Sequence, residues 1–132
     1  MVKFYDSIEP QLEEWAMKQA VFFTASAPLN GKHINLSPKG LPATSFSILN
    51  PNLCGYVDAT GSGIETVSHI YENGRVTIMF CSFEASPRIL RLFCTGRVVE
   101  WNDPGFDGWL KRMGDKNIKG ARAATILDVF KV

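Results

Sequence analysis

The chain of 132 residues has only three cysteines and two histidines, which limits the chemistry it can support. No two cysteines have C-x-x-C spacing, and their odd number argues against a disulfide framework. Cys54, Cys81 and Cys94 each lie among apolar neighbours in expected strands, which is typical of small buried side chains, with a reactive thiol as the alternative. His33 and His69 have no metal-ligand spacing. A zinc ribbon or another metal site is therefore not supported.

An excess of charge of one sign and long apolar runs are also missing. The 14 Lys and Arg residues nearly balance the 13 Asp and Glu residues, and both signs are mixed along the chain. This argues against a nucleic-acid or membrane-surface binder. No apolar run reaches the roughly 18–20 residues needed to cross a bilayer, and the N-terminus has no apolar signal core. We therefore expect a soluble, cytoplasmic protein with neither nucleic acid nor membrane as a partner.

What the chain does have is enough apolar residues for one core. At 45% hydrophobic residues, we expect residues 1–132 to form a single domain. Helical spacing predicts helices at 10–19, at 62–72 and from 104 onward. The second helix is expected to bury Ile64, Val67, Ile70 and Tyr71. β-Forming residues predict strands at 21–26, 33–37, 46–49, 53–58, 75–81, 88–101 and 121–132.

Two residues are expected to interrupt these strands. Pro38 should end the strand at 33–37, and Gly96 should introduce a bulge or bend into the longest strand. Several strands are joined by hairpin-length turns, and only one long crossover helix separates them. The pattern predicts a mainly β protein with peripheral helices, built as a small and mostly antiparallel barrel.

The segment after the strand at 53–58 is the strongest local indication of function. It reads Thr60-Gly61-Ser62-Gly63 and leads directly into a helix, so backbone N–H groups at the helix start favour an anion. The alternative is a turn with an ordinary cap, because the segment is neither a dinucleotide-binding fingerprint nor a P-loop. Ser62 also lacks the G-x-S-x-G context of a hydrolase nucleophile, so we expect no catalytic triad.

A second indication lies at the end of the strand at 33–37. Ser37 and Lys39 place a hydroxyl and a cation close together, and Gly40 lets a ligand approach the backbone. Lys39 is therefore a candidate partner for a phosphate group, with a solvated lysine in a turn as the alternative.

Five segments in order resemble the pyridoxamine 5'-phosphate oxidase-like family, and more narrowly its small branch found in bacteria and fungi. The resemblance covers nearly the whole chain and depends on 33–40 (HINLSPKG), 56–63 (YVDATGSG), 72–81 (ENGRVTIMFC), 87–92 (PRILRL) and 96–100 (GRVVE).

The resemblance implies a split β-barrel that binds FMN at the interface of a homodimer. By residue-to-residue correspondence, it implies cofactor-binding roles for Ser37, Lys39, Thr60, Gly61, Ser62, Thr66 and Arg91. It implies no catalytic side chain, because the flavin itself carries the redox chemistry. We therefore expect an FMN-dependent oxidoreductase that acts on an unknown small substrate. The alternative is a non-catalytic split-barrel dimer that binds flavin or another ligand.

The chain also departs from the family pattern. Authentic pyridoxamine phosphate oxidases have an arginine near the position of Ile34, and an Arg-Lys pair where this chain has Gly63 and Ile64. Two phosphate-binding cations are thus missing, so we do not expect an oxidase of vitamin B6. Members of the branch continue beyond the strand that corresponds to 126–132, so we expect either a short or a truncated member.

Overall fold

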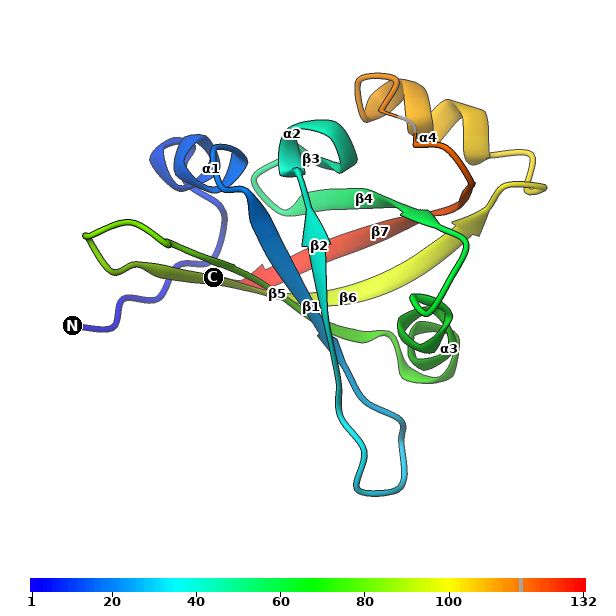
Figure 1. Cartoon of the computed structure of the whole chain (residues 1–132), viewed down its shortest axis with the longest axis horizontal. Helices are drawn as coiled ribbons and strands as arrows, with labels where there is room; N and C mark the ends of the chain where they lie inside the picture. Colours follow the sequence, from blue (N-terminus) through cyan, green and yellow to red (C-terminus); the bar gives the residue numbers. More distant parts are fainter. Residues whose placement is uncertain (117) are drawn as a thin grey trace.

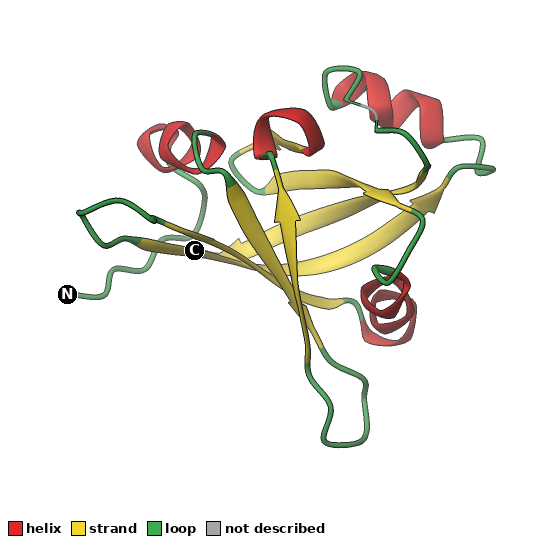
Figure 2. Ribbon diagram, viewed as in Figure 1, coloured by secondary structure: helices red, strands yellow, loops and turns green. Residues whose placement is uncertain are grey.

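The computed structural model describes residues 1–116 and 118–132, and its centre is a seven-stranded sheet with the strand order β2-β1-β5-β6-β7-β4-β3 (Figures 1 and 2). All neighbouring strands are antiparallel. The strands are β1 (Val21–Ser26), β2 (Asn35–Gly40), β3 (Phe46–Asn50), β4 (Leu53–Ala59), β5 (Arg75–Cys81), β6 (Ile89–Glu100) and β7 (Ala121–Lys131). The sheet curls into a split barrel, which confirms the predicted fold class.

In the part of the chain that the structure describes, four helices lie around the sheet (Figure 2). They are α1 (Pro10–Met17), α2 (Pro42–Ser45), α3 (Ile64–Asn73) and α4 (Phe106–Arg112). No helix within residues 1–116 and 118–132 is both long and apolar enough to cross a membrane. Three of these helices are confirmed within a few residues of their expected ends: those predicted at 10–19, at 62–72 and after 104. The short α2 was not predicted.

The concave side of the sheet holds an aromatic cluster at the centre of the core. Phe22 lies 5.0 Å from Phe46, 5.7 Å from Tyr56 and 5.8 Å from Phe80 between ring centroids. All four rings are almost completely buried. They come from β1, β3, β4 and β5, so the cluster joins strands from both halves of the sheet.

Strand β2 differs from its prediction, because it begins at Asn35 and runs through Pro38 to Gly40. The expectation that Pro38 ends this strand is wrong. β2 is an edge strand that pairs only with β1, and an edge strand tolerates a proline because one side of its backbone needs no partner. The extension matters for the site, since it places Lys39 within the sheet rather than in a turn.

The expected bulge at Gly96 is also wrong. The register between β6 and β7 shifts between Phe93 and Cys94, whereas Gly96 pairs regularly with Leu127. Gly96 is needed for close packing instead: a Cβ there would lie 3.3 Å from the side chains of both Leu127 and Val76. Its N–H also donates to the carbonyl oxygen of Gly74 at 2.7 Å.

Helix α3 buries Val67 and Ile70, as periodicity predicts, but not Ile64 and Tyr71. Ile64 and Tyr71 are 51% and 61% exposed, whereas Thr66, Val67, His69 and Ile70 are buried. His69 Nδ1 is hydrogen bonded to the hydroxyl of Ser26 at 2.8 Å, which satisfies both buried polar groups. The shift toward Thr66 brings that hydroxyl under strand β2.

Candidate functional site

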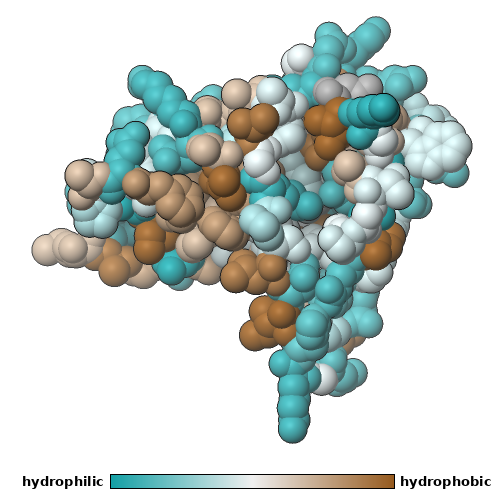
Figure 3. Space-filling view, in the orientation of Figure 1, coloured by the Kyte–Doolittle hydropathy of each residue, from teal (hydrophilic) through white to brown (hydrophobic). Residues whose placement is uncertain are grey.

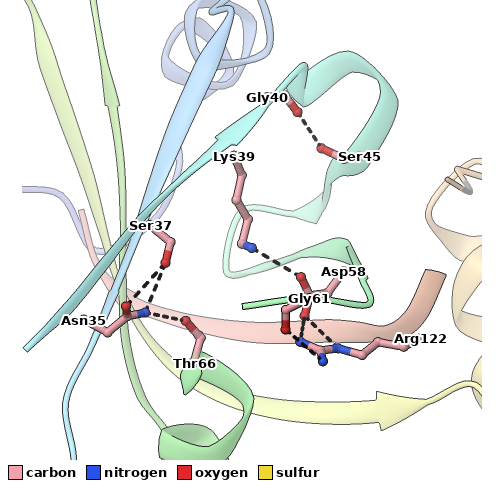
Figure 4. A network of polar contacts seen from close by, with 9 residues as sticks. All are labelled: Asn35, Ser37, Lys39, Gly40, Ser45, Asp58, Gly61, Thr66 and Arg122. Atoms are coloured by element: carbon pink, nitrogen blue, oxygen red, sulfur yellow. Dashed lines mark hydrogen bonds and ion pairs between the residues drawn. The ribbon is translucent and has the colours of Figure 1, made fainter. Parts of the chain in front are cut away.

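Alternation along β2 turns three polar side chains toward the inside of the barrel. Asn35, Ser37 and Lys39 are half-buried, while the residues between them are exposed. Ser37 lies opposite Thr24 and Lys39 lies opposite Phe22, and both of these β1 residues are fully buried. The predicted phosphate partner, Lys39, therefore points into the barrel rather than into solvent (Figure 4).

The ammonium group of this lysine pairs with a buried carboxylate. The ammonium of Lys39 lies 3.2 Å from Oδ1 of Asp58, and the guanidinium of Arg122 contacts Oδ2 of the same residue through Nη2 at 2.9 Å and Nε at 3.3 Å. The Asp58 side chain is only 5% exposed, and the two cations are 17% and 16% exposed. Two cations and one carboxylate leave this cluster with one net positive charge. We call these three residues the charge cluster.

The glycine-flanked turn lies directly beside the charge cluster. The carbonyl oxygen of Gly61 accepts a hydrogen bond from Arg122 Nη1 at 3.5 Å. A Cβ at Gly63 would lie 2.8 Å from Oδ1 of Asp58, so only glycine lets the turn approach the carboxylate this closely. Gly61 itself has a φ of +149°, with open space where a side chain would be. The start of α3 and its backbone N–H groups thus lie next to the charge cluster.

The turn is hydrogen bonded to the residue that immediately precedes β7. Thr60 donates from its backbone N–H and from its hydroxyl to the carbonyl oxygen of Gly120, at 2.9 and 3.2 Å. Ser62 is exposed, and its carbonyl oxygen accepts the N–H of Glu65 at 3.2 Å. The predicted hydroxyls of Thr60 and Ser62 therefore lie in the turn, although Thr60 is already committed to a carbonyl.

A second polar group connects β2 with α3. Nδ2 of Asn35 donates to the hydroxyls of Ser37, at 3.1 Å, and Thr66, at 3.0 Å (Figure 4). Thr66 is only 1% exposed. Two of the predicted residues are thus brought together by an asparagine that the sequence analysis did not select.

The floor of the site is a neutral aromatic ring. The Lys39 ammonium lies 5.3 Å from the centroid of the Tyr56 ring. Burial raises the pKa of the Tyr56 hydroxyl above its ordinary value. The phenol therefore stays protonated at neutral pH and adds no charge to the charge cluster.

Arg91 is not brought to this site within one chain. It is exposed on β6 opposite Met79, whereas its neighbours Leu90 and Leu92 are buried in the core. Because side chains alternate along a strand, Arg91 lies on the outer side of the sheet. There it borders a hollow of about 520 Å³ together with the N-terminal residues. Its role in cofactor binding remains a prediction.

Sequence reasoning missed Asp58, Arg122 and Asn35. A signal existed for Asp58, because a carboxylate that ends a buried strand requires a cationic partner. Arg122 carried no such signal: it comes 64 positions after Asp58 and meets it only because β4 pairs with β7. Arg122 supplies a second cation to the site, beside Lys39.

The comparison with curated proteins gives a close relative. No family model matches the chain. Over 129 residues, which make up 98% of this chain, it is 60% identical to the Pyridoxamine 5'-phosphate oxidase family protein ustO of Aspergillus flavus. The chain spans about half, 52%, of the length of that relative.

Solved structures share the fold at low sequence identity. HupZ of Group A Streptococcus matches with a TM-score of 0.72 and 19% identity, over 95% of this chain and 99% of that chain. An FMN-binding protein of Syntrophomonas wolfei matches with a TM-score of 0.59 and 14% identity, over 89% of this chain and 78% of that chain. These matches show the fold, and the close relative confirms the resemblance found in the five sequence segments: over nearly its whole length, this chain is a homologue of a pyridoxamine 5'-phosphate oxidase family protein.

Proposed function

We propose that this chain binds FMN and acts as an FMN-dependent oxidoreductase on an unknown small substrate. One observation carries the proposal: the half-buried cations Lys39 and Arg122 converge beside the glycine-flanked start of α3. The name of the relative from Aspergillus flavus and the FMN-binding protein among the solved structures support the same cofactor.

The residues of the site fit a phosphate group. Lys39 and Arg122 provide charge-assisted donors, and together with Asp58 they retain one net positive charge. Open space beside Gly61 lets a ligand approach the backbone of the turn, and the hydroxyls of Ser37 and Ser62 are further donors. These groups would hold and orient the phosphate end of the cofactor.

Bound FMN would supply the hydride transfer, so the chain needs no nucleophilic side chain. The protein contributes position and electrostatics. A second candidate function is a non-catalytic flavin- or ligand-binding barrel. The observation that favours it is the pairing of Asp58 with both cations, which lowers the net charge available to a phosphate.

The absorbance spectrum of protein purified without added cofactor tests the proposal. We expect a band near 450 nm, typical of oxidised flavin, and release of FMN on denaturation. Bleaching of the band by NADH or NADPH, followed by oxygen consumption, would identify an enzyme; a band that neither nucleotide bleaches would favour the binding barrel. Colourless protein that takes up no FMN on titration would contradict both flavin proposals.

We further propose that the chain forms a homodimer through the outer side of the sheet. Several large apolar side chains are exposed there, and Figure 3 shows hydrophobic residues over β2 and the end of the loop that leads into it. Ile34, Leu36 and Phe130 are 72%, 63% and 63% exposed, and a hollow of about 500 Å³ lies beside Ile34 and Phe130. A partner subunit would remove this apolar surface from water.

Sedimentation at micromolar concentration tests the dimer. The wild type is expected to sediment as a dimer, and Ile34→Asp is expected to shift it toward the monomer because the substitution places a charge on the apolar surface. Phe83→Asp, at an exposed loop residue between β5 and β6, is the control. A wild type that sediments as a clean monomer would remove the proposal.

A further inference from the structure

The charge cluster already contains an anion. The Asp58 carboxylate lies between an ammonium and a guanidinium and beside the N-terminal turn of a helix, which is the environment that also suits a phosphate. Its two oxygens are divided between the two cations, Oδ1 toward Lys39 and Oδ2 toward Arg122. The cluster is therefore internally satisfied before any ligand arrives.

The hydrogen bonds of Arg122 determine which of its N–H groups are available to a ligand. Its Nε and Nη2 form the paired edge that binds a carboxylate or a phosphate through two parallel N–H groups, and both atoms contact Oδ2 of Asp58. Its Nη1 is directed at the carbonyl oxygen of Gly61. Arg122 can offer its paired edge to a phosphate only if Asp58 gives up those donors.

Lys39 is constrained in a similar way. Its ammonium is only partly accessible and is directed at Oδ1 of Asp58, above the ring of Tyr56. Near the same helix start, the carboxylate of Glu65 contacts Nε2 of His33. A second carboxylate at α3 therefore has its own partner, and Asp58 is the acidic group in direct contact with both cations.

From these contacts we infer that Asp58 is a built-in competitor for the anion site, and that it sets the preference between phosphorylated and unphosphorylated ligands. The inference rests on the proposed function for the identity of the cofactor, but not for the competition itself. A ligand phosphate must take donors away from Asp58, so the carboxylate weakens the binding of every anion. Only a doubly charged group with several oxygens regains enough contacts to displace it.

The substitution Asp58→Asn tests this competition. It keeps the size of the side chain and removes the negative charge that pairs with both cations, which is expected to strengthen anion binding by about tenfold or more. The measurement is the increase in Tm caused by inorganic phosphate, from which the phosphate affinity follows. Asp58→Ser is measured in parallel, so the test of the competition does not depend on whether one variant folds.

Asp128→Asn is the matched control. Asp128 of β7 forms an ion pair with Arg97 of β6 at 2.8 Å, but both side chains are more than half exposed. Removing this carboxylate changes the net charge of the protein by the same amount. Its response to phosphate is expected to equal that of the wild type, which separates a local effect at Asp58 from a general change in charge.

Flavin titrations extend the test to ligand preference. The ratio of FMN affinity to riboflavin affinity is expected to rise about tenfold in Asp58→Asn, because riboflavin has no phosphate to benefit from the lost competitor. If neither flavin binds to any variant, the proposed function fails. The change in phosphate affinity would still test whether Asp58 competes with anions. The inference would be overturned if both Asp58 variants bound phosphate no more tightly than the wild type. It would also be overturned if none of the proteins bound phosphate.

Discussion

Replacing Arg122 by methionine is expected to weaken FMN binding by roughly 100-fold, about 2–3 kcal/mol. Arg122 is one of the two half-buried cations of the charge cluster, and it is the one that also reaches the Gly61 carbonyl of the turn. Methionine keeps much of the length of the side chain but none of its donors. The folded state is also expected to lose about 1–3 kcal/mol, because Asp58 remains buried with fewer hydrogen bonds.

Arg97→Met is the control for this experiment. Arg97 also pairs with an aspartate at 2.8 Å, but its side chain is 51% exposed. Its loss is expected to cost less than about 1 kcal/mol and to leave flavin affinity unchanged. Flavin fluorescence titration and denaturant unfolding measure the two quantities. Equal FMN affinity in Arg122→Met and the wild type would show that the charge cluster does not hold the phosphate.

Phe22→Ala is expected to have the largest effect on stability, with a loss of about 3–5 kcal/mol. The ring is fully buried and touches three other aromatic rings, two of them from β3 and β4 in the other half of the sheet. Alanine would leave a cavity that these rings cannot close without moving their strands. Since total stabilities of such domains are about 5–15 kcal/mol, this loss is a large share of the whole.

Urea unfolding followed by fluorescence and circular dichroism measures this change, and Phe83→Ala is its control. Phe83 is 71% exposed in the loop between β5 and β6, so its replacement is expected to change the unfolding free energy by less than about 0.5 kcal/mol. A loss below about 1 kcal/mol in Phe22→Ala would mean that the aromatic cluster does not hold the two halves of the sheet together.

Most of the helices and strands could be predicted from the sequence because their local residue patterns were strong. The dense runs of β-forming residues at 21–26 and 75–81 coincide with β1 and β5. Pro38 and Gly96 were misread because their meaning depends on position in the sheet. A proline is tolerated at an edge, and a glycine can serve packing rather than bending.

The candidate site was predictable only in part, for a related reason. Lys39 and the turn at 60–63 carry local signals of anion binding, and the structure places both next to Asp58. The partner Arg122 comes from a pairing of strands far apart in the sequence, which no local pattern reveals. The buried face of α3 likewise depends on which strands pack against it, so periodicity alone could not choose between Thr66 and Tyr71.

The charge cluster has one mechanical consequence. Lys39 belongs to β2, at one margin of the sheet, whereas Asp58 belongs to β4, next to the strand at the opposite margin. Within the residues that the structure describes, no backbone ladder joins the two margins of the sheet, so the contact between Lys39 and Asp58 connects β2 and β4 across the open side of the barrel. If a bound phosphate drew Lys39 away from Asp58, this contact would be lost, and the amide hydrogen exchange of β2 would then depend on the proposed cofactor.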